Sequence, residues 1–323
     1  MKVFHIEQFR IPLPQGHPFP MEKYERLHQR VVEAAIVETH NLCVPRAATV
    51  REIRLVHDLQ YTDRAEQGKL TAQEMRRIGF PWSMELMERA RRSCGATIEA
   101  CRAALVDGLG VSLSGGTHHA FPDHGEGYCL YNDTAIASRT MQGEGRVRRV
   151  LIIDCDAHQG NGTAVIFRED PTVFTFSIHG KNNFPARKET SDLDLPLEDD
   201  TDDTGYLQAL EEGVCQAIQS IRAELAIYLA GADPYNDDRY GRLALSKQGL
   251  AERDRVVLRE CRNAGIPVAI TMAGGYARQV DDTVDIHFQT VKTAADLAGE
   301  GETETPVRED QEAAVVTGGN ICQ

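Results

Sequence analysis

The most constraining feature of this 323-residue chain is an apolar run followed by three regularly spaced polar side chains. Residues 150–153, Val-Leu-Ile-Ile, predict a strand that is buried on both faces, which is typical of parallel sheets. Asp154, Asp156 and His158 then occupy every second position. Such residues point to one face of an extended chain, so two carboxylates and an imidazole are expected to gather at the strand end. A solvated polar strand end is the simpler interpretation.

Strand and helix patterns alternate along most of the chain. The predicted strands are 2–6, 111–114, 149–154, 172–178, 225–229 and 266–272, and the main predicted helices are 83–106, 131–142, 162–168, 204–222, 246–263 and 281–297. This alternation predicts an α/β fold, with a single domain built on an open, mostly parallel β-sheet and helices on both faces. We place this domain at residues 1–298. The segment 299–323 is acidic, rich in Gly and Thr and poorly apolar, and we expect a disordered tail.

Composition and charge narrow the class of protein. The net charge of −14 argues against a nucleic-acid partner and mildly favours cationic substrates. We expect no membrane partner, because no stretch approaches the about 18 apolar residues that a membrane-spanning helix needs. The N-terminal residues do not resemble a secretory signal. The eight cysteines are scattered without a CxxC pair, which indicates reduced thiols in a cytoplasmic protein.

Four predicted strands end in polar or glycine-rich segments, at 115–119, 154–158, 231–233 and 274–276. The carboxyl ends of parallel strands share one edge of a sheet, and ligands of open α/β sheets bind there. We therefore expect Asp156, His158 and Asp233 to converge. One nitrogen and two oxygen donors with an open position are typical of a catalytic zinc or a related divalent ion. Taken alone, Asp233 before Pro234 also fits the start of a turn.

An acid–base pair is also predicted at this edge. His118 and His119 are adjacent and follow two glycines, although buried histidines are more often structural. Asp154 would orient one imidazole and keep it basic, whereas the neutral amide of Asn161 would leave the other with a lower pKa. Tyr276 follows two further glycines and would donate a hydrogen bond to an oxyanion, unless it merely packs at the rim.

Several motifs in order carry a resemblance to a known family. They are GGTHHA (115–120), GEGYCLYND (125–133), DCDAHQGNG (154–162), GADPYNDDRYGRL (231–243) and AGGY (273–276). From about residue 15 to 297, the chain resembles the histone deacetylase family, which has the arginase/deacetylase fold. The segments DAHQGNG, GHPFPMEKY (16–24) and RRIGFPW (76–82) are similar to class IV members and their bacterial relatives.

The resemblance implies a zinc-dependent deacylase that hydrolyses the N-acyl amide of acyl-lysine. The implied zinc ligands are Asp156, His158 and Asp233. His118 and His119 would form the acid/base pair, and Tyr276 would polarise the carbonyl. The implied structural potassium site would use Asp154, Asp156, His158, Ser177 and Ile178.

A narrow channel for the acyl-lysine stem is implied as well. Tyr128 and Phe184 would form its walls, with Gly127 and Gly275 beside them. Tyr128 departs from the family, which usually carries Phe in a Gly-Phe-Cys motif, so the extra hydroxyl is expected to change the preference of the channel.

Other functions were weighed against this one. A manganese ureohydrolase needs bridging carboxylates where Gly160 and Gly231 stand. A non-catalytic acyl-lysine-binding scaffold is expected to lack a ligand, the histidine pair or the tyrosine, and none is missing. Protein acetyl-lysine, long-chain acyl-lysine and small acylated amines such as acetylpolyamines all remain open as substrates, and the motifs do not address the oligomeric state.

Overall fold

One parallel sheet forms the centre of the computed structural model, which describes residues 1–300. Its strand order is β2-β1-β3-β8-β7-β4-β5-β6, and every neighbouring pair is parallel. The strands are β1 (Lys2–Phe4), β2 (Leu42–Cys43), β3 (Leu109–Ser112), β4 (Val150–Asp154), β5 (Val173–Gly180), β6 (Leu193–Leu197), β7 (Leu225–Leu229) and β8 (Val268–Thr271). The predicted α/β fold with an open parallel sheet is confirmed.

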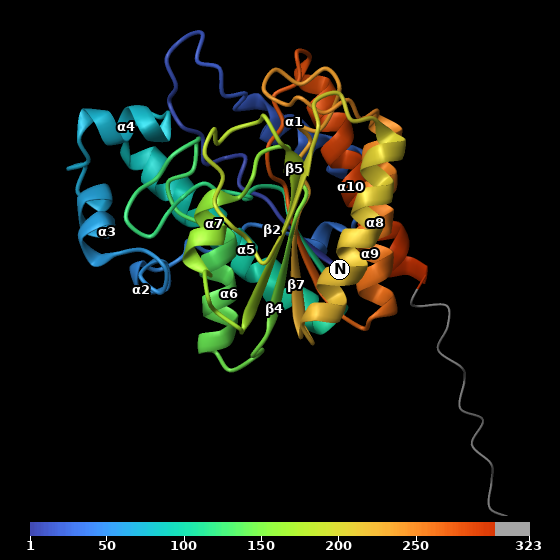
Figure 1. Ribbon diagram of the computed structural model, residues 1–323. Coiled ribbons are helices and arrows are strands. Elements are labelled where there is room, and N and C mark those ends of the chain that lie inside the picture. Colours follow the sequence, from blue (N-terminus) through green and yellow to red (C-terminus); the bar gives the residue numbers. More distant parts are fainter. Residues whose placement is uncertain (301–323) are drawn as a thin grey trace, which may run out of the picture.

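Helices cover both faces of this sheet (Figure 1). On one face lie α5 (Met84–Asp107), α6 (Asp133–Gly143) and α7 (Asn161–Ile166), with the short helices α2 (Val50–Ile53), α3 (Leu59–Glu66) and α4 (Ala72–Ile78) beyond them. On the other lie α1 (Glu22–Ala34), α8 (Asp203–Ser220), α9 (Lys247–Asn263) and α10 (Val280–Glu300). Within the described residues, no helix combines the length and apolarity needed to cross a membrane.

The continuous apolar run of β4 is explained by burial on both faces. Val150 and Ile152 belong to the hydrophobic core under α5 and α6, whereas Leu151 and Ile153 belong to the core under α8, α9 and α10. All four side chains are buried. Because side chains alternate, Asp154 continues the α5 and α6 side of the strand.

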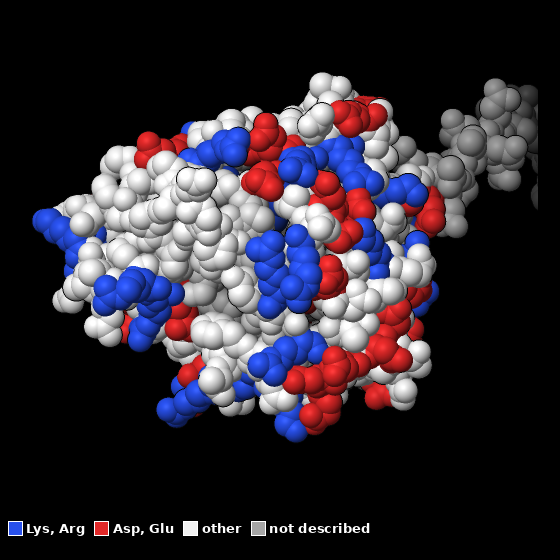
Figure 2. All heavy atoms as spheres, turned by 90° about the horizontal axis from the view of Figure 1, so that it is seen from above, with Lys and Arg blue, Asp and Glu red and all other residues white. Residues whose placement is uncertain are grey.

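The strand order places a topological switch point between β4 and β7. From β4 the chain proceeds to β5 and β6 in one direction, and from β7 to β8 in the other. Such a switch point opens a crevice at the carboxyl ends of the strands, where ligands of open α/β sheets bind. These ends lie at the top of Figure 1, and Figure 2 looks down on them.

Some predicted boundaries differ from the structure. No strand is predicted between residues 178 and 204, but this segment contains β6, an edge strand whose fourth residue is Pro196. β3 begins at Leu109 and includes Gly110, where a Cβ would lie 2.2 Å from the carbonyl oxygen of Ala100 in α5. α10 continues to Glu300, three residues beyond the predicted end. The predicted tail therefore starts inside a helix, and residues 301–323 lie outside the described residues.

Candidate active site

Side chains from four adjacent strand ends line one cavity of about 720 Å³. The strands β3, β8, β7 and β4 are neighbours in the sheet. The residues that follow them in the cavity wall are His118 and His119, then Gly274 and Tyr276, then Asp233, then Asp156 and His158. The convergence expected from the strand ends is thus present in the structure.

Asp156, His158 and Asp233 form a compact donor set. The Nδ1 atom of His158 lies 3.0 Å from Oδ1 of Asp156 and 3.1 Å from Oδ2 of Asp233. Burial and the charge of Asp156 raise the pKa of Asp233 to about 7. Despite burial, hydrogen bonds to both carboxylates raise the pKa of His158 to about 10. Two buried carboxylates and one imidazole at this spacing fit a zinc ion, whose charge would offset their repulsion.

Main-chain groups fix these carboxylates in place. The Ala157 amide donates to Oδ1 of Asp233 at 2.8 Å, and the Gly274 amide donates to Oδ2 of Asp156 at 2.7 Å. Position 274 has no room for a side chain, because a Cβ there would lie 1.9 Å from Oδ2 of Asp233 and 2.6 Å from Oδ2 of Asp156. The donor set therefore depends on a glycine at the end of β8.

We expect Gly274→Ala to lower the affinity for zinc at least about tenfold, because the new methyl group displaces both carboxylates. Zinc content after dialysis, measured by plasma mass spectrometry, checks this. Gly143→Ala is the matched control, since a Cβ at position 143 meets no atom within 4 Å. Full zinc content in Gly274→Ala would contradict the assignment.

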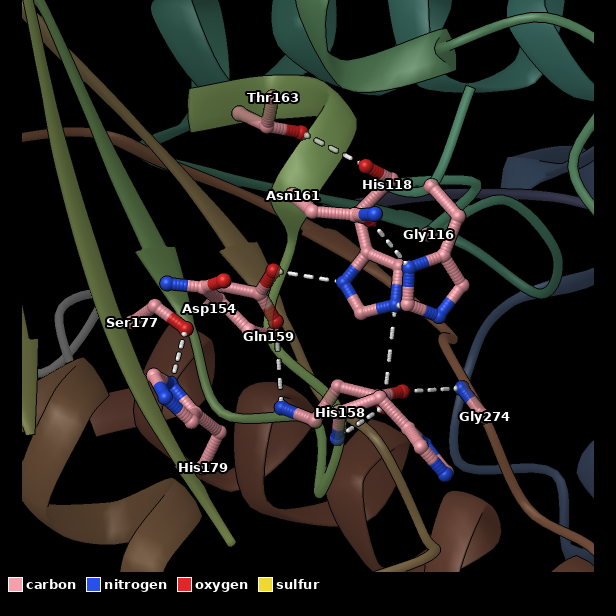
Figure 3. A network of polar contacts seen from close by, with 12 residues as sticks. Gly116, His118, Asp154, His158, Gln159, Asn161, Thr163, Ser177, His179 and Gly274 are labelled. Carbon is pink, nitrogen blue, oxygen red and sulfur yellow. Dashed lines mark hydrogen bonds and ion pairs between the residues drawn. The ribbon is translucent and has the colours of Figure 1, made fainter. Parts of the chain in front are cut away.

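The two histidines have different partners, as predicted, and Figure 3 shows the contact between His118 and Asp154. Nδ1 of His118 lies 2.7 Å from Oδ2 of Asp154, and Nδ1 of His119 lies 2.7 Å from Oδ1 of Asn161. Their Nε2 atoms are 3.2 Å apart. The Asn161 amide also donates to Glu126, so its oxygen faces His119. That arrangement places the His119 proton on Nδ1 and leaves Nε2 as an acceptor.

The partners also separate the two pKa values. Burial lowers the pKa of His118, but the charges of Asp154 and Asp156 outweigh it and raise the value to about 9. Burial and the charges of His118 and His158 hold the pKa of His119 well below its usual range. One imidazole is therefore charged and the other neutral near pH 7.

An aromatic wall surrounds the cavity above the donor set. The Phe184 ring stands edge-on to the His119 ring at 4.9 Å, and the Tyr128 ring lies 5.8 Å from that of Tyr276. Sequence reasoning missed two further members, Phe19 and Tyr240, whose rings lie 6.2 Å and 5.1 Å from Tyr276. The motif segments 16–24 and 231–243 contain both, but sequence alone does not show which of their residues turn inward.

The segment that carries Tyr128 is hydrogen-bonded to the end of α4. The amides of Gly127 and Tyr128 donate to the carbonyl oxygens of Arg77 and Ile78 at the end of that helix. Gly127 has φ +57°, and a Cβ there would lie 2.7 Å from the His119 ring, so close approach requires glycine. Burial and the neighbouring Tyr240 raise the pKa of Tyr128 to about 12, which keeps the extra hydroxyl neutral.

Tyr276 is held by two residues that sequence reasoning missed. Its amide donates to Asp238 at 2.6 Å. Lys23 of α1 is buried, donates to the Gly275 carbonyl oxygen at 3.2 Å, and lies 5.2 Å from the centre of the Tyr276 ring. A lysine in an amphipathic helix is normally expected on the solvent-exposed face, so the sequence pattern did not predict that Lys23 is buried.

A buried ion pair supports the donor set from below. Arg253 is fully buried, and it donates to the carbonyl oxygens of Gly231 and Cys155. These residues come shortly before Asp233 and Asp156, the two candidate metal ligands that follow β7 and β4. Asp254 accepts from the Arg253 guanidinium at 2.8 Å and from the Tyr228 hydroxyl at 2.6 Å. Adjacent opposite charges in a helix are usually solvated, which is why sequence reasoning missed this pair.

The residues of the implied potassium site also lie together. Ser177 of β5 is the register partner of Asp154 in β4, and Ser177 and Ile178 are both buried. The Ser177 hydroxyl is 2.9 Å from Nδ1 of His179 (Figure 3). Asp156 and His158 follow directly after β4. Potassium itself stays a prediction from the resemblance.

Comparisons with known proteins agree with these motifs. A family model described as the histone deacetylase domain matches residues 17–291. An uncharacterized protein of Picosynechococcus sp. is 43% identical over 295 residues, which cover 91% of this chain and 98% of that protein. Histone deacetylase 2 of Arabidopsis thaliana is 28% identical over 282 residues, covering 83% of this chain and 73% of that protein.

Solved structures show the same fold at low sequence identity. An HDAC homolog from Aquifex aeolicus has a TM-score of 0.79 at 20% identity and covers 91% of this chain and 83% of that chain. An HDAC homolog complexed with SAHA has a TM-score of 0.78 at 20% identity, with 92% and 84% covered. Fold and family model together define a deacetylase-type hydrolase. The chain belongs to the histone deacetylase family, which confirms the resemblance predicted from its motifs.

Proposed function

We propose that this protein is a zinc-dependent deacylase that hydrolyses the N-acyl amide of acyl-lysine. The observation that carries the proposal is that the histidine pair lies directly beside the three-residue donor set. Nε2 of His118 is only 3.8 Å from Oδ1 of Asp156. The alternative, an acetylpolyamine amidohydrolase, would use the same chemistry, so the mouth of the cavity has to distinguish between the two substrates.

Asp156, His158 and Asp233 would hold the zinc. When bound, zinc would polarise the acyl carbonyl and lower the pKa of a water molecule. The neutral Nε2 of His119 accepts a proton from the attacking water, and Tyr276 donates a hydrogen bond to the carbonyl oxygen as negative charge develops there. The charged His118 supplies a proton to the departing amine.

The first experiment combines zinc analysis with acetyl-lysine and myristoyl-lysine peptides, with and without a chelator. We expect one zinc per chain and activity that the chelator abolishes. His119→Ala and Tyr276→Phe should each lower kcat at least about 100-fold with zinc retained, because they remove the base and the oxyanion donor. Wild-type rates in both variants would exclude these roles.

The pH profile tests how the histidines divide their roles. Asp154→Asn removes the carboxylate that raises the His118 pKa, so His118 should lose its proton at a lower pH. We expect the basic limb of the kcat profile to move down by about 1 to 3 pH units, the usual effect of a neighbouring opposite charge. Asn161→Asp should instead move the acidic limb upward by raising the pKa of His119. An unchanged profile in Asp154→Asn would refute the assignment of His118.

The cavity supports acyl groups longer than acetyl. Its volume is about 720 Å³, and its wall includes apolar side chains besides the channel aromatics, namely Ile11, Ile78, Leu86, Ala90 and Leu130. Burial of each methylene of an acyl chain against such a wall contributes about 0.8 kcal/mol. We therefore propose that myristoyl-lysine is hydrolysed at least as efficiently as acetyl-lysine.

Charges at the mouth favour acyl-lysine over acetylpolyamines. Arg76 and Arg77 at the end of α4 are exposed cavity-lining residues, and neither has an ion-pair partner within residues 1–300. Arg242 lines the cavity as well and pairs with Asp199 at 3.2 Å. Lys and Arg side chains lie beside a hollow of uncharged surface on this face (Figure 2). The acidic total charge suggested cationic substrates, but the local charge at the mouth is basic and repels a polyamine.

We expect acetyl-lysine peptides with acidic flanking residues to react faster than basic peptides or acetylspermidine. Arg76→Glu and Arg77→Glu should each shift the kcat/KM ratio of acidic to basic peptides about fivefold toward the basic peptide, and less in 0.5 M salt. Arg148→Glu is the matched control, because Arg148 precedes β4 at the opposite end of the sheet and is 88% exposed. Equal kcat/KM ratios in all variants would mean that Arg76 and Arg77 do not contribute to substrate choice.

We also propose that the protein works in a reducing, cytoplasmic setting. The seven cysteines within residues 1–300 are all free thiols, and five of them are buried in or beside the core. Burial raises the pKa of the Cys101 thiol, so the buried cysteines act as small apolar side chains.

A further inference from the structure

A second group of metal-binding side chains lies outside the candidate active site. His5 and Glu7 follow the end of β1, and His28 lies in the middle of α1. Their donor atoms all lie within 4.8 Å of one another, as do those of the candidate zinc ligands. None of the three residues lines the active-site cavity.

The carboxylate of Glu7 lies between two imidazole nitrogens. Nδ1 of His5 is 2.7 Å from Oε2 of Glu7, and Nδ1 of His28 is 3.4 Å from Oε1. These distances bracket the 3.0 and 3.1 Å spacings between donor atoms at the candidate zinc site. The two imidazole rings stack with their centres 4.1 Å apart and their planes at 21°, so both Nδ1 atoms face the same carboxylate.

Metal binding requires an ionised carboxylate and neutral imidazoles, so an ion at this site would displace the protons that the imidazoles share with Glu7.

We propose that His5, Glu7 and His28 form a second binding site for a divalent transition metal such as Zn²⁺ or Ni²⁺. Two imidazoles and one carboxylate suit these ions, and water fills the remaining coordination positions. The side chains of His5, Glu7 and His28 are 12%, 18% and 24% exposed, so an ion enters from solvent. His28 is the most exposed of the three residues, so its ring has room to turn and direct its lone pair at a bound ion.

An ion at this site would fasten α1 to the end of β1. Lys23, five residues before His28 in the same helix, donates to the Gly275 carbonyl oxygen beside Tyr276. The second site would therefore stabilise the helix that supports one wall of the active site. A plain hydrogen-bonded network of two histidines and a glutamate would give the same contacts without any affinity for metal, and the experiment must separate the two.

The test counts metal ions in each site independently. The protein is loaded with excess Zn²⁺, dialysed into buffer with 20 µM free zinc, and analysed by mass spectrometry. We expect about two zinc ions in the wild type, about one in His28→Ala and Glu7→Gln, and about one in Asp233→Asn, which retains only the second site. His40→Ala is the matched control, because His40 is an exposed histidine that pairs with Glu38 outside the cluster.

Titration of metal-free Asp233→Asn with Ni²⁺ by calorimetry gives a second measurement. We expect one binding event that is lost when Glu7→Gln is added, and a rise in the melting temperature that is lost when His28→Ala is added. His28→Ala and Glu7→Gln should keep their deacylase activity. No ion in Asp233→Asn, or equal stoichiometry in the wild type and both cluster variants, would overturn the second site. Because Asp233→Asn reports on it alone, failure of the proposed function would not be mistaken for failure of this inference.

Discussion

Repulsion between two buried carboxylates is the constraint that the surrounding structure has to satisfy. Asp156 and Asp233 lie on either side of His158 with almost no exposure to water. Main-chain amides of the segments that follow β4 and β8 bind their oxygens, and the buried Arg253 guanidinium binds carbonyl groups of the segments that carry the two carboxylates. Leaving a buried charge unpaired costs several kcal/mol, roughly 3 to 5. A divalent cation at the proposed zinc site would complete the balance of charge.

The order of the strands makes this arrangement possible. β4 and β7 are neighbours although 70 residues lie between the end of β4 and the start of β7, and β8 and β3 lie next in the sheet. Each strand ends at the same edge, so a short polar segment after each strand is enough to build the site. The helices on both faces bury the strands and leave this edge open, and this explains why chemically active residues and core residues alternate so sharply in the sequence.

Much of this arrangement could be predicted from the sequence, and the parts that could not share a physical cause. The apolar run before Asp154 predicted a buried strand, and alternation with helices predicted the parallel sheet. The donor set and the unlike partners of His118 and His119 followed from residue types near strand ends. By contrast, Lys23, Asp238 and Arg253 act through contacts between distant segments, and local patterns carry no information about such contacts. The short edge strand β6 was hidden for the same reason.

The attachment of α4 to the channel has an evolutionary consequence. This helix presents Arg76 and Arg77 to the solvent, and its final carbonyl groups bind the backbone of Gly127 and Tyr128. None of the strand-end residues belongs to it. If the two arginines select substrates as proposed, natural variation in them would redirect which partners reach the cavity while the reactive groups stay unchanged. Such proteins would then diversify their targets through a single short helix, under selection that is separate from the selection acting on the chemistry.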